Sequence, residues 1–181
     1  MPSPATPLHT VQFPLSGTDD MSKLALDGLL VIALEHAVAG PYCSRLLVEG
    51  GARVIKLERA EGDFARAYDK IIQGESAYFV WLNSGKESVV VDLKTEADQL
   101  LLNNLLNRAD VFLQNLRPGA IDRLGYGYDV VKQINPKLVM CSISGYGSES
   151  THAQMKAYDA LIQAETGLCS VTGPPDHPSK V

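Results

Sequence analysis

Short, mostly apolar runs alternate with helical patterns along most of this chain. The runs cover residues 28–34, 52–58, 88–93, 110–116 and 137–144. Runs of this length are typical of strands, and the nearly unbroken first run suits a strand that is covered on both faces of a sheet. The pattern therefore predicts five strands.

Helical patterns follow three of these runs. Pro41 suits a helix start and Gly50–Gly51 a helix stop, so a helix is expected between them. Thr95 precedes a second helix and forms a weak capping box with Asp98. Residues 129–135 predict a third, shorter helix. The second helix carries leucines at helical spacing, namely Leu101, Leu102, Leu105 and Leu106.

The alternation of strands and helices, joined by short loops, indicates an α/β fold with a Rossmann-like, doubly wound parallel sheet. In such sheets, ligands bind outside the carboxyl ends of the strands. Residues 23–181 are expected to form this domain. Residues 1–22 are rich in Pro, Ser and Thr and are expected to form a flexible tail.

Composition and charge argue against several classes of partner. The chain has 181 residues, 45% of them hydrophobic, and a net charge of −5. An acidic balance argues against general nucleic-acid binding, which requires a basic face for the phosphates. No apolar run approaches the roughly 20 residues that a membrane-spanning helix needs. Because the N-terminus also lacks the features of a secretory signal or a transit peptide, we expect a cytoplasmic protein with no nucleic-acid or membrane partner.

Cysteines and histidines give no sign of a metal site. Cys43, Cys141 and Cys169 have no CxxC spacing and predict reduced, mostly buried thiols. The four histidines are scattered, without partners three or four residues away. No metal site is therefore expected.

Polar side chains follow the predicted strands, at the edge where ligands are expected. Four are cations and one is an amide: Arg59, Lys94, Asn115, Arg117 and Arg123. Guanidinium groups bind phosphate through two parallel hydrogen bonds, so this set suits a polyanionic ligand. Scattered surface charge is the alternative interpretation for each residue taken singly.

The common dinucleotide and nucleophile motifs are absent. A dinucleotide site requires GxGxxG directly after the first strand, whereas this chain has AVAGPY, with one glycine and a proline that donates no N–H. There is no Walker A motif and no GxSxG elbow. These absences argue against a Rossmann nicotinamide or flavin site.

Four other motifs occur in order with near-constant spacing: AGP, GAxVIKLE, GKxSVxxDLK and NxRPGxxDRLG. With the later blocks INPKLVMCSISGYG and YDALIQAETGLCSVTG, they extend from about Leu26 to Gly173. In this combination the chain resembles the class III CoA-transferases, the superfamily of formyl-CoA transferase and the α-methylacyl-CoA racemases. The resemblance implies that the chain forms the N-terminal part of the family's large, Rossmann-like domain.

The resemblance also implies an enzyme that moves CoA from an acyl-CoA donor to a free carboxylate. In the family, an aspartate attacks the donor thioester to form a mixed anhydride, and CoA thiolate converts this to an enzyme-bound thioester that the acceptor resolves. Acyl-CoA and a small carboxylic acid would be the substrates, with coenzyme A as no more than a substrate and no prosthetic group. Donor and acceptor stay open; succinyl-CoA with a short dicarboxylic acid is an expectation by analogy.

Carried over residue by residue, the family's CoA site falls on Ala37, Val38, Arg59, Val91, Lys94, Asn115, Arg123 and Lys156. The four cations among them are expected to bind the phosphates of CoA, and Ala37 and Val38 match the loop beside the thioester. Formyl-CoA transferase has a glutamine at the position of Val38. The missing polar contact argues against a formyl or oxalyl substrate.

The resemblance assigns supporting roles to Tyr158 and Asp159, because the nucleophilic aspartate of the family lies in an element beyond Val181. Asp159 matches an acidic residue beside the active site; alternatively, it only caps the helix that follows. Tyr158 matches a histidine that racemases use as an acid and base. Tyrosine, with a pKa of about 10, is a poor base at neutral pH, which favours a transferase over a racemase. A non-catalytic CoA-binding module is a further alternative.

Family members are longer than this chain, and the resemblance implies that they form an interlocked homodimer. We therefore expect the chain alone to be inactive and to expose apolar surface.

Overall fold

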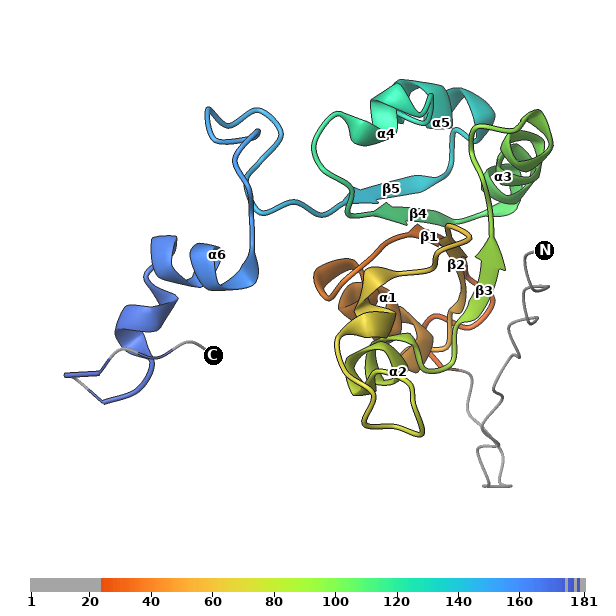
Figure 1. Cartoon of the computed structure of the whole chain (residues 1–181). Coiled ribbons are helices and arrows are strands. Elements are labelled where there is room, and N and C mark those ends of the chain that lie inside the picture. The colour runs from red at the N-terminus through yellow and green to blue at the C-terminus, as the bar shows by residue number, and fades with distance from the viewer. Residues whose placement is uncertain (1–23, 175, 178, 180–181) are drawn as a thin grey trace, which may run out of the picture.

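The computed structural model describes residues 24–174, 176, 177 and 179, so the predicted tail at residues 1–22 lies outside the described part. A five-stranded sheet forms the centre of the molecule (Figure 1). Its strands are β1 Leu30–Leu34, β2 Arg53–Glu58, β3 Glu87–Val90, β4 Val111–Gln114 and β5 Val139–Ser142. They lie in the order β3-β2-β1-β4-β5 and all pairs are parallel. The predicted α/β fold with a doubly wound parallel sheet is confirmed.

Helices connect the strands and cover both faces of the sheet (Figure 1). In chain order they are α1 Ala39–Glu49, the 3-10 turn η1 Phe64–Ala67, α2 Ala77–Asn83, α3 Glu96–Arg108, α4 Ala120–Arg123, α5 Tyr128–Ile134, α6 Asp159–Glu165 and the 3-10 turn η2 Leu168–Val171. None of the helices in the described residues is long and apolar enough to cross a membrane.

The side chains of each strand alternate between the two faces, and both faces are apolar. On one face, Val31 and Val54 pack in a cluster with Leu47 of α1. On the other face, Ile32 and Phe112 pack in a cluster with the buried leucines of α3 and with the buried valine of α5. This burial on both sides explains why the strands appear as short apolar runs in the sequence.

The strand order reverses between β1 and β4. The chain leaves β1 toward α1 on one face and leaves β4 toward α4 and α5 on the other face (Figure 1). The two connections therefore diverge at the carboxyl edge of the sheet. Doubly wound sheets bind their ligands at this switch point.

The predicted third strand ends earlier than expected, at Val90, because Asp92 turns the chain. Oδ1 of Asp92 accepts the N–H of Lys94 at 3.0 Å. The predicted cap of α3 is confirmed in one half, since Oγ1 of Thr95 accepts the N–H of Asp98 at 3.3 Å. The reciprocal half is wrong: the carboxylate of Asp98 instead accepts the N–H of Asp92 at 2.7 Å.

Helix α2 was not predicted from the sequence. Its residues read AYFVWLN, an almost continuous apolar run in which Leu82 is the buried side chain. Such a run has no helical period. The signal that does exist is at its start, where Oγ of Ser76 accepts the N–H of Phe79 at 3.3 Å.

The segment after β5 leads away from the sheet and carries α6 (Figure 1). A hydrogen bond from the guanidinium of Arg117 to the carbonyl oxygen of Gln154, at 3.1 Å, joins this segment to the connection after β4. Leu161 of α6 and Val171 of η2 are exposed. Helix α6 therefore presents apolar surface to solvent in this chain.

Candidate functional site

The loop between β1 and α1 is held by side chains from the segments that follow its two neighbouring strands, β4 and β2. The N–H of His36 donates to Oδ1 of Asn115 at 2.9 Å, and Nδ2 of Asn115 donates to the carbonyl oxygen of His36 at 2.8 Å. The N–H of Ala37 donates to Oδ1 of Asp63 at 3.1 Å. Asn115 directly follows β4, and Asp63 lies in the loop after β2. The loop at the switch point is thus tied to the elements on either side of it.

Ala37 needs this support, because its backbone is left-handed, with φ of 63°. A residue with a Cβ adopts this conformation at a cost of about 1–2 kcal/mol. Gly40, in the first turn of α1, is required by close packing. A Cβ at this position would lie 2.8 Å from Cγ of Asn115 and 3.0 Å from Cβ of Glu35.

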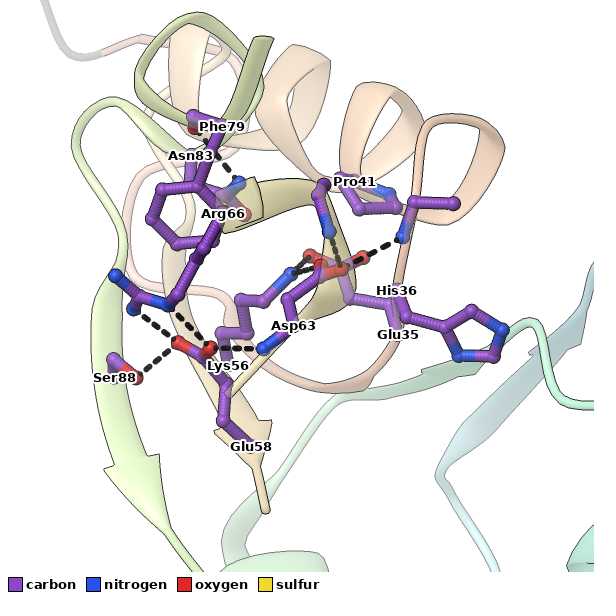
Figure 2. A network of polar contacts seen from close by, with 12 residues as sticks. Glu35, His36, Pro41, Lys56, Glu58, Asp63, Arg66, Phe79, Asn83 and Ser88 are labelled. Carbon is purple, nitrogen blue, oxygen red and sulfur yellow. Dashed lines mark hydrogen bonds and ion pairs between the residues drawn. The ribbon is translucent and has the colours of Figure 1, made fainter. Parts of the chain in front are cut away.

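Beneath this loop lies a buried charge cluster (Figure 2). It consists of Glu35, Lys56, Glu58, Asp63 and Lys86. Lys56 pairs in register with Ala33, so its side chain points from the middle of the sheet toward α1. Burial of charges in an apolar layer is costly unless each one is paired.

Each charge in the cluster has a partner. Nζ of Lys56 lies 2.7 Å from Oδ2 of Asp63 and 3.9 Å from Oε1 of Glu35. Glu35 also accepts a hydrogen bond from Oγ of Ser44 at 2.8 Å and pairs with Lys86 at 2.8 Å. Within the described residues, no buried side-chain nitrogen or oxygen lacks a hydrogen-bond partner. The cluster is therefore a fully satisfied network that joins β1, β2 and the loop after β2.

Glu58 forms the second half of the network. Burial alone would raise the pKa of its carboxyl group, but hydrogen bonds outweigh this effect and lower the pKa to about 2. They come from Arg66 at 2.8 Å, from Oγ of Ser88 at 2.7 Å and from the N–H of Asp63 at 2.9 Å. The guanidinium of Arg66 also lies 3.8 Å from the ring centre of Phe79 (Figure 2). Glu58 therefore fixes the backbone of Asp63. Through its ion pair with Arg66 it also fixes the guanidinium group that lies over Phe79 of α2.

Lys86 is the cation that completes the pairing of Glu35. Its Nζ also donates to the carbonyl oxygen of Pro41 at 2.9 Å and to Oδ1 of Asn83 at 3.1 Å. Burial lowers the pKa of Lys86 to about 8, although the charge of Glu35 opposes this shift. Lys86 thereby connects the end of α2 to the first turn of α1.

His36 faces the opposite way from the charge cluster, and its ring points away from the carboxylates (Figure 2). A cavity of about 300 Å³ opens here between the ends of β1 and β2, lined in part by His36, Arg59, Phe64 and Leu116. The rings of His36 and Phe64 are 5.2 Å apart. Burial lowers the pKa of His36, against the opposing charge of Asp63, so the neutral imidazole is favoured at this wall.

A second cavity, of about 360 Å³, lies beyond the ends of β4 and β5. Its walls include Gln114, Tyr128, Ser142 and Ser144. The two cavities flank the switch point, so the carboxyl edge of the sheet is hollowed on either side of the loop that contains Ala37.

The structure places most of the predicted CoA-contacting residues at this carboxyl edge. Arg59 directly follows β2, is exposed, and lies 3.8 Å from Glu61. Val91 directly follows β3 and is buried, with its N–H bonded to the carbonyl oxygen of Glu58 at 2.8 Å. Lys94 is exposed in the turn before α3.

Of the remaining predicted residues at this edge, Val38 is exposed at the start of α1. Arg123 is exposed at the end of α4, and a Cβ at Gly119 would lie 3.1 Å from its Nη1. The guanidinium therefore folds back toward the connection after β4. Asn115, predicted as a CoA contact, already uses its amide to bind the backbone of His36, which leaves it one further N–H.

Lys156, Tyr158 and Asp159 are exposed in the segment around the start of α6, apart from the sheet (Figure 1). The described residues do not bring these three side chains onto the strand ends. The interpretation of Asp159 as a helix cap is wrong. Tyr158 occupies the cap position without a side-chain hydrogen bond, and Asp159 is the first residue of α6, where it accepts from Nε2 of Gln163 at 2.7 Å.

The sequence interpretation missed the charge cluster and His36. The available signal was a charged residue inside an apolar strand, Lys56, and another directly after the first strand, Glu35. Charges at such positions are rarely buried unless they are paired. The sequence alone does not say with what they pair.

The fold and the hollowed carboxyl edge define a doubly wound α/β protein with cavities on either side of its switch point. Residues 26–181 match the model of CoA-transferase family III. The chain therefore belongs to this family, as its motifs predicted.

Relatives of established name agree with this membership. The chain is 43% identical over 157 residues to the acetyl-CoA:oxalate CoA-transferase of Acetobacter aceti, an alignment that covers 86% of this chain and 40% of that protein. It is 38% identical to the succinate–glutarate CoA-transferase of Agrobacterium fabrum, with 85% of this chain and 40% of that protein covered. The chain thus spans about 40% of the length of these relatives.

A solved structure of similar fold agrees with this family membership. The chain is similar to a CAIB/BAIF family protein from Brucella suis, with a TM-score of 0.82 and 37% sequence identity. The match covers 88% of this chain and 44% of that one.

Proposed function

We propose that this chain is the CoA-binding, N-terminal part of an enzyme that transfers CoA from an acyl-CoA to a small carboxylic acid. Family membership over residues 26–181 is the observation that carries the proposal. Coenzyme A enters as a substrate, and the exchange needs no prosthetic group. An interlocked homodimer in the cytoplasm is the proposed form of the whole enzyme.

The cations of the carboxyl edge are the proposed contacts for the phosphates of CoA. Arg59, Lys94 and Arg123 are exposed on the connections that follow β2, β3 and β4. Guanidinium groups suit two-point contacts with phosphate, and an ammonium group suits a single one. Lys156 would join them if the segment before α6 folded over this edge in the whole enzyme.

The loop with Ala37 and Val38 is proposed to lie beside the thioester. Its exposed apolar side chain, Val38, offers no hydrogen bond to an acyl group, in keeping with a donor that is recognised by shape. Val91 and Asn115 would form the floor under the ligand. Tyr158 and Asp159 are proposed as supporting groups at the acyl end.

The exchange is proposed to use an aspartate outside this chain. Its carboxylate attacks the thioester carbonyl and displaces CoA thiolate, which leaves an acyl-aspartyl anhydride. The thiolate then attacks the aspartyl carbonyl, releases the donor's acid as a carboxylate and forms an aspartyl-CoA thioester. The acceptor carboxylate reverses the two steps. Residues of this chain would hold CoA in place while its thiolate is free.

Two measurements test this proposal. Calorimetric titration of the chain with CoA should give saturable binding, which Arg59→Ala weakens. A protein that extends the chain to the length of its relatives should form an enzyme-CoA thioester, detectable by mass, when it is incubated with an acyl-CoA. Oxalate, succinate and glutarate, the acids in the names of the relatives, are the first acceptors to screen.

The outcomes separate the alternatives. Fast exchange of the α-hydrogen of a 2-methylacyl-CoA in D₂O, without any acceptor acid, would identify a racemase instead. If the extended protein binds CoA but transfers it to none of the acids, the chain belongs to a CoA-binding module without transferase activity.

A further inference from the structure

Ala37, the middle residue of the loop His36–Val38, has a backbone conformation that alanine does not favour. Ala37 is left-handed at φ 63°, and no glycine stands at that position. Two independent side chains hold its peptides: Asn115 binds both backbone polar groups of His36, and Asp63 binds the N–H of Ala37. Residues in this region of φ and ψ persist when the surrounding structure determines them.

Each of the two side chains is itself fixed. Asn115 packs directly on Gly40, where a Cβ would lie 2.8 Å from its Cγ, and its amide makes two hydrogen bonds to the backbone of His36. Asp63 is buried, is bonded to Lys56 at 2.7 Å, and accepts the N–H of Ala65 at 2.9 Å. The loop is therefore held between two rigid supports, one from each neighbour of β1.

We propose that Asn115 and Asp63 are positioning residues that hold the loop His36–Val38 in place, with Ala37 left-handed, before any ligand arrives. This inference rests on the proposed function, because the loop that the two residues hold is the one assigned to the thioester end of CoA. A loop that is already ordered loses less conformational entropy when it binds. Asp63 then acts on CoA only through the loop, whereas Asn115 acts through the loop in addition to its proposed place under the ligand. The buried charge cluster serves to hold Asp63.

The first experiment measures amide hydrogen exchange in the 181-residue chain without ligand. Each supporting side chain is removed in turn, and the exchange rate is measured at the amide that the other side chain binds. Faster exchange at that amide then reports a less ordered loop and not merely the loss of one hydrogen bond. In Asn115→Ala, the N–H of Ala37 should exchange at least tenfold faster, while the N–H of Phe112 in the core keeps its rate. Asn107→Ala, on the exposed side of α3, serves as the control and should change neither amide.

Asp63 requires a design that keeps Lys56 from being left unpaired. The variants Lys56→Met/Asp63→Asn and Lys56→Met/Asp63→Ala both lack the buried ion pair, but only the first keeps an oxygen for the N–H of Ala37. Faster exchange at His36 in the second than in the first supports the positioning role. Equal exchange in both would overturn it.

A second-site change tests the cause. Gly adopts φ near 63° without the cost that Ala incurs, so Ala37→Gly should restore about fivefold of the CoA affinity lost in Asn115→Ala. An Ala37 amide that is unprotected in the unchanged chain, or unaltered in Asn115→Ala, refutes the proposal. If CoA fails to bind the unchanged chain while the exchange results hold, the proposed function fails and the positioning role stands.

Discussion

Asn115 pairs with both backbone polar groups of His36, a residue 79 positions earlier in the chain. These two hydrogen bonds replace the backbone bonds of a paired strand at the point where β1 and β4 stop pairing and their connections diverge. They thereby extend the contact between the two chain segments past the last backbone pair of β1 and β4. The loop of the candidate site begins from a fixed peptide rather than from a free strand end.

Glu58 should make the stability of the chain depend on acid pH. Its pKa in the folded state is about 2, against an ordinary value of 4.5, so the folded state binds this proton less tightly than the unfolded state. The contribution is present above pH 4.5 and is lost as the pH falls toward 2; its size is about 3 kcal/mol. Urea unfolding of the unchanged chain and of Glu58→Gln at several pH values should show a flatter acid limb in the variant. Glu61→Gln, at an exposed carboxylate, should keep the slope of the unchanged chain.

Lys86 should affect stability in the alkaline range. Its pKa falls from 10.5 to about 8 on folding, so between these values the unfolded state binds more protons and stability rises with pH. At pH 7, Lys86→Met should destabilise the chain by about 3 kcal/mol, because Glu35 loses its nearest cation. The rise between pH 8 and 10.5 should also disappear. The double variant Glu35→Gln/Lys86→Met should recover part of the loss; a double variant as unstable as the sum of the two single ones would contradict the pairing.

Arg59 and Arg123 should determine the affinity for CoA. Removal of a charge-assisted contact with phosphate costs about 1.5–3 kcal/mol, so Arg59→Ala and Arg123→Ala should each weaken CoA binding about tenfold or more. Calorimetric titration measures the effect. Arg108→Ala is the matched control, because Arg108 is exposed at the end of α3, next to the opposite edge of the sheet. If all three variants bind CoA with equal affinity, the CoA site does not lie at this edge of the sheet.

Asn135 should stabilise the end of α3. Its Nδ2 donates to the carbonyl oxygens of Leu106 and Ala109, at 3.0 and 2.8 Å. Asn135→Ala leaves these acceptors without that donor and should cost about 1–2 kcal/mol. Asn135→Asp should cost more, because a carboxylate would face the negative end of the helix. Thermal unfolding gives the order of the three proteins, and an aspartate variant more stable than the alanine variant would contradict this role.

The five strands and the helices α1, α3 and α5 could be predicted from the sequence, because burial on both faces of the sheet gives each strand a recognisable apolar run. Each strand between two layers of helices is a short apolar run, and Thr95 caps α3 with a side chain that is visible in the sequence. Strand ends were less predictable, as with Val90, because a single turn residue decides them. The run that forms α2 is apolar throughout and carries no period from which its shape follows.

Of the candidate site, too, one part could be predicted from the sequence and another part could not. Its exposed cations were predicted because chain order places them after strands, and parallel strands end at the same edge. The left-handed Ala37, the pairing of Asn115 with His36 and the charge cluster depend on contacts between elements far apart in the sequence. Lys56 and Glu35 lie 21 positions apart, and neither reveals the other's presence without the sheet that joins their strands.

The central place of β1 has a consequence for the order of folding. Among the described residues β1 is the first strand, yet one of its two partners, β4, begins directly after Asp110, which lies 80 positions beyond its hydrogen-bond partner Leu30. During synthesis, β1 can pair with β2, and β2 with β3, while the other edge of β1 stays open, since contacts of high sequence separation form late. Asn115 arrives with β4, so the loop at residues 36–38 acquires its final shape only when that strand docks. Ligand competence should therefore appear as a late, all-or-none step of refolding.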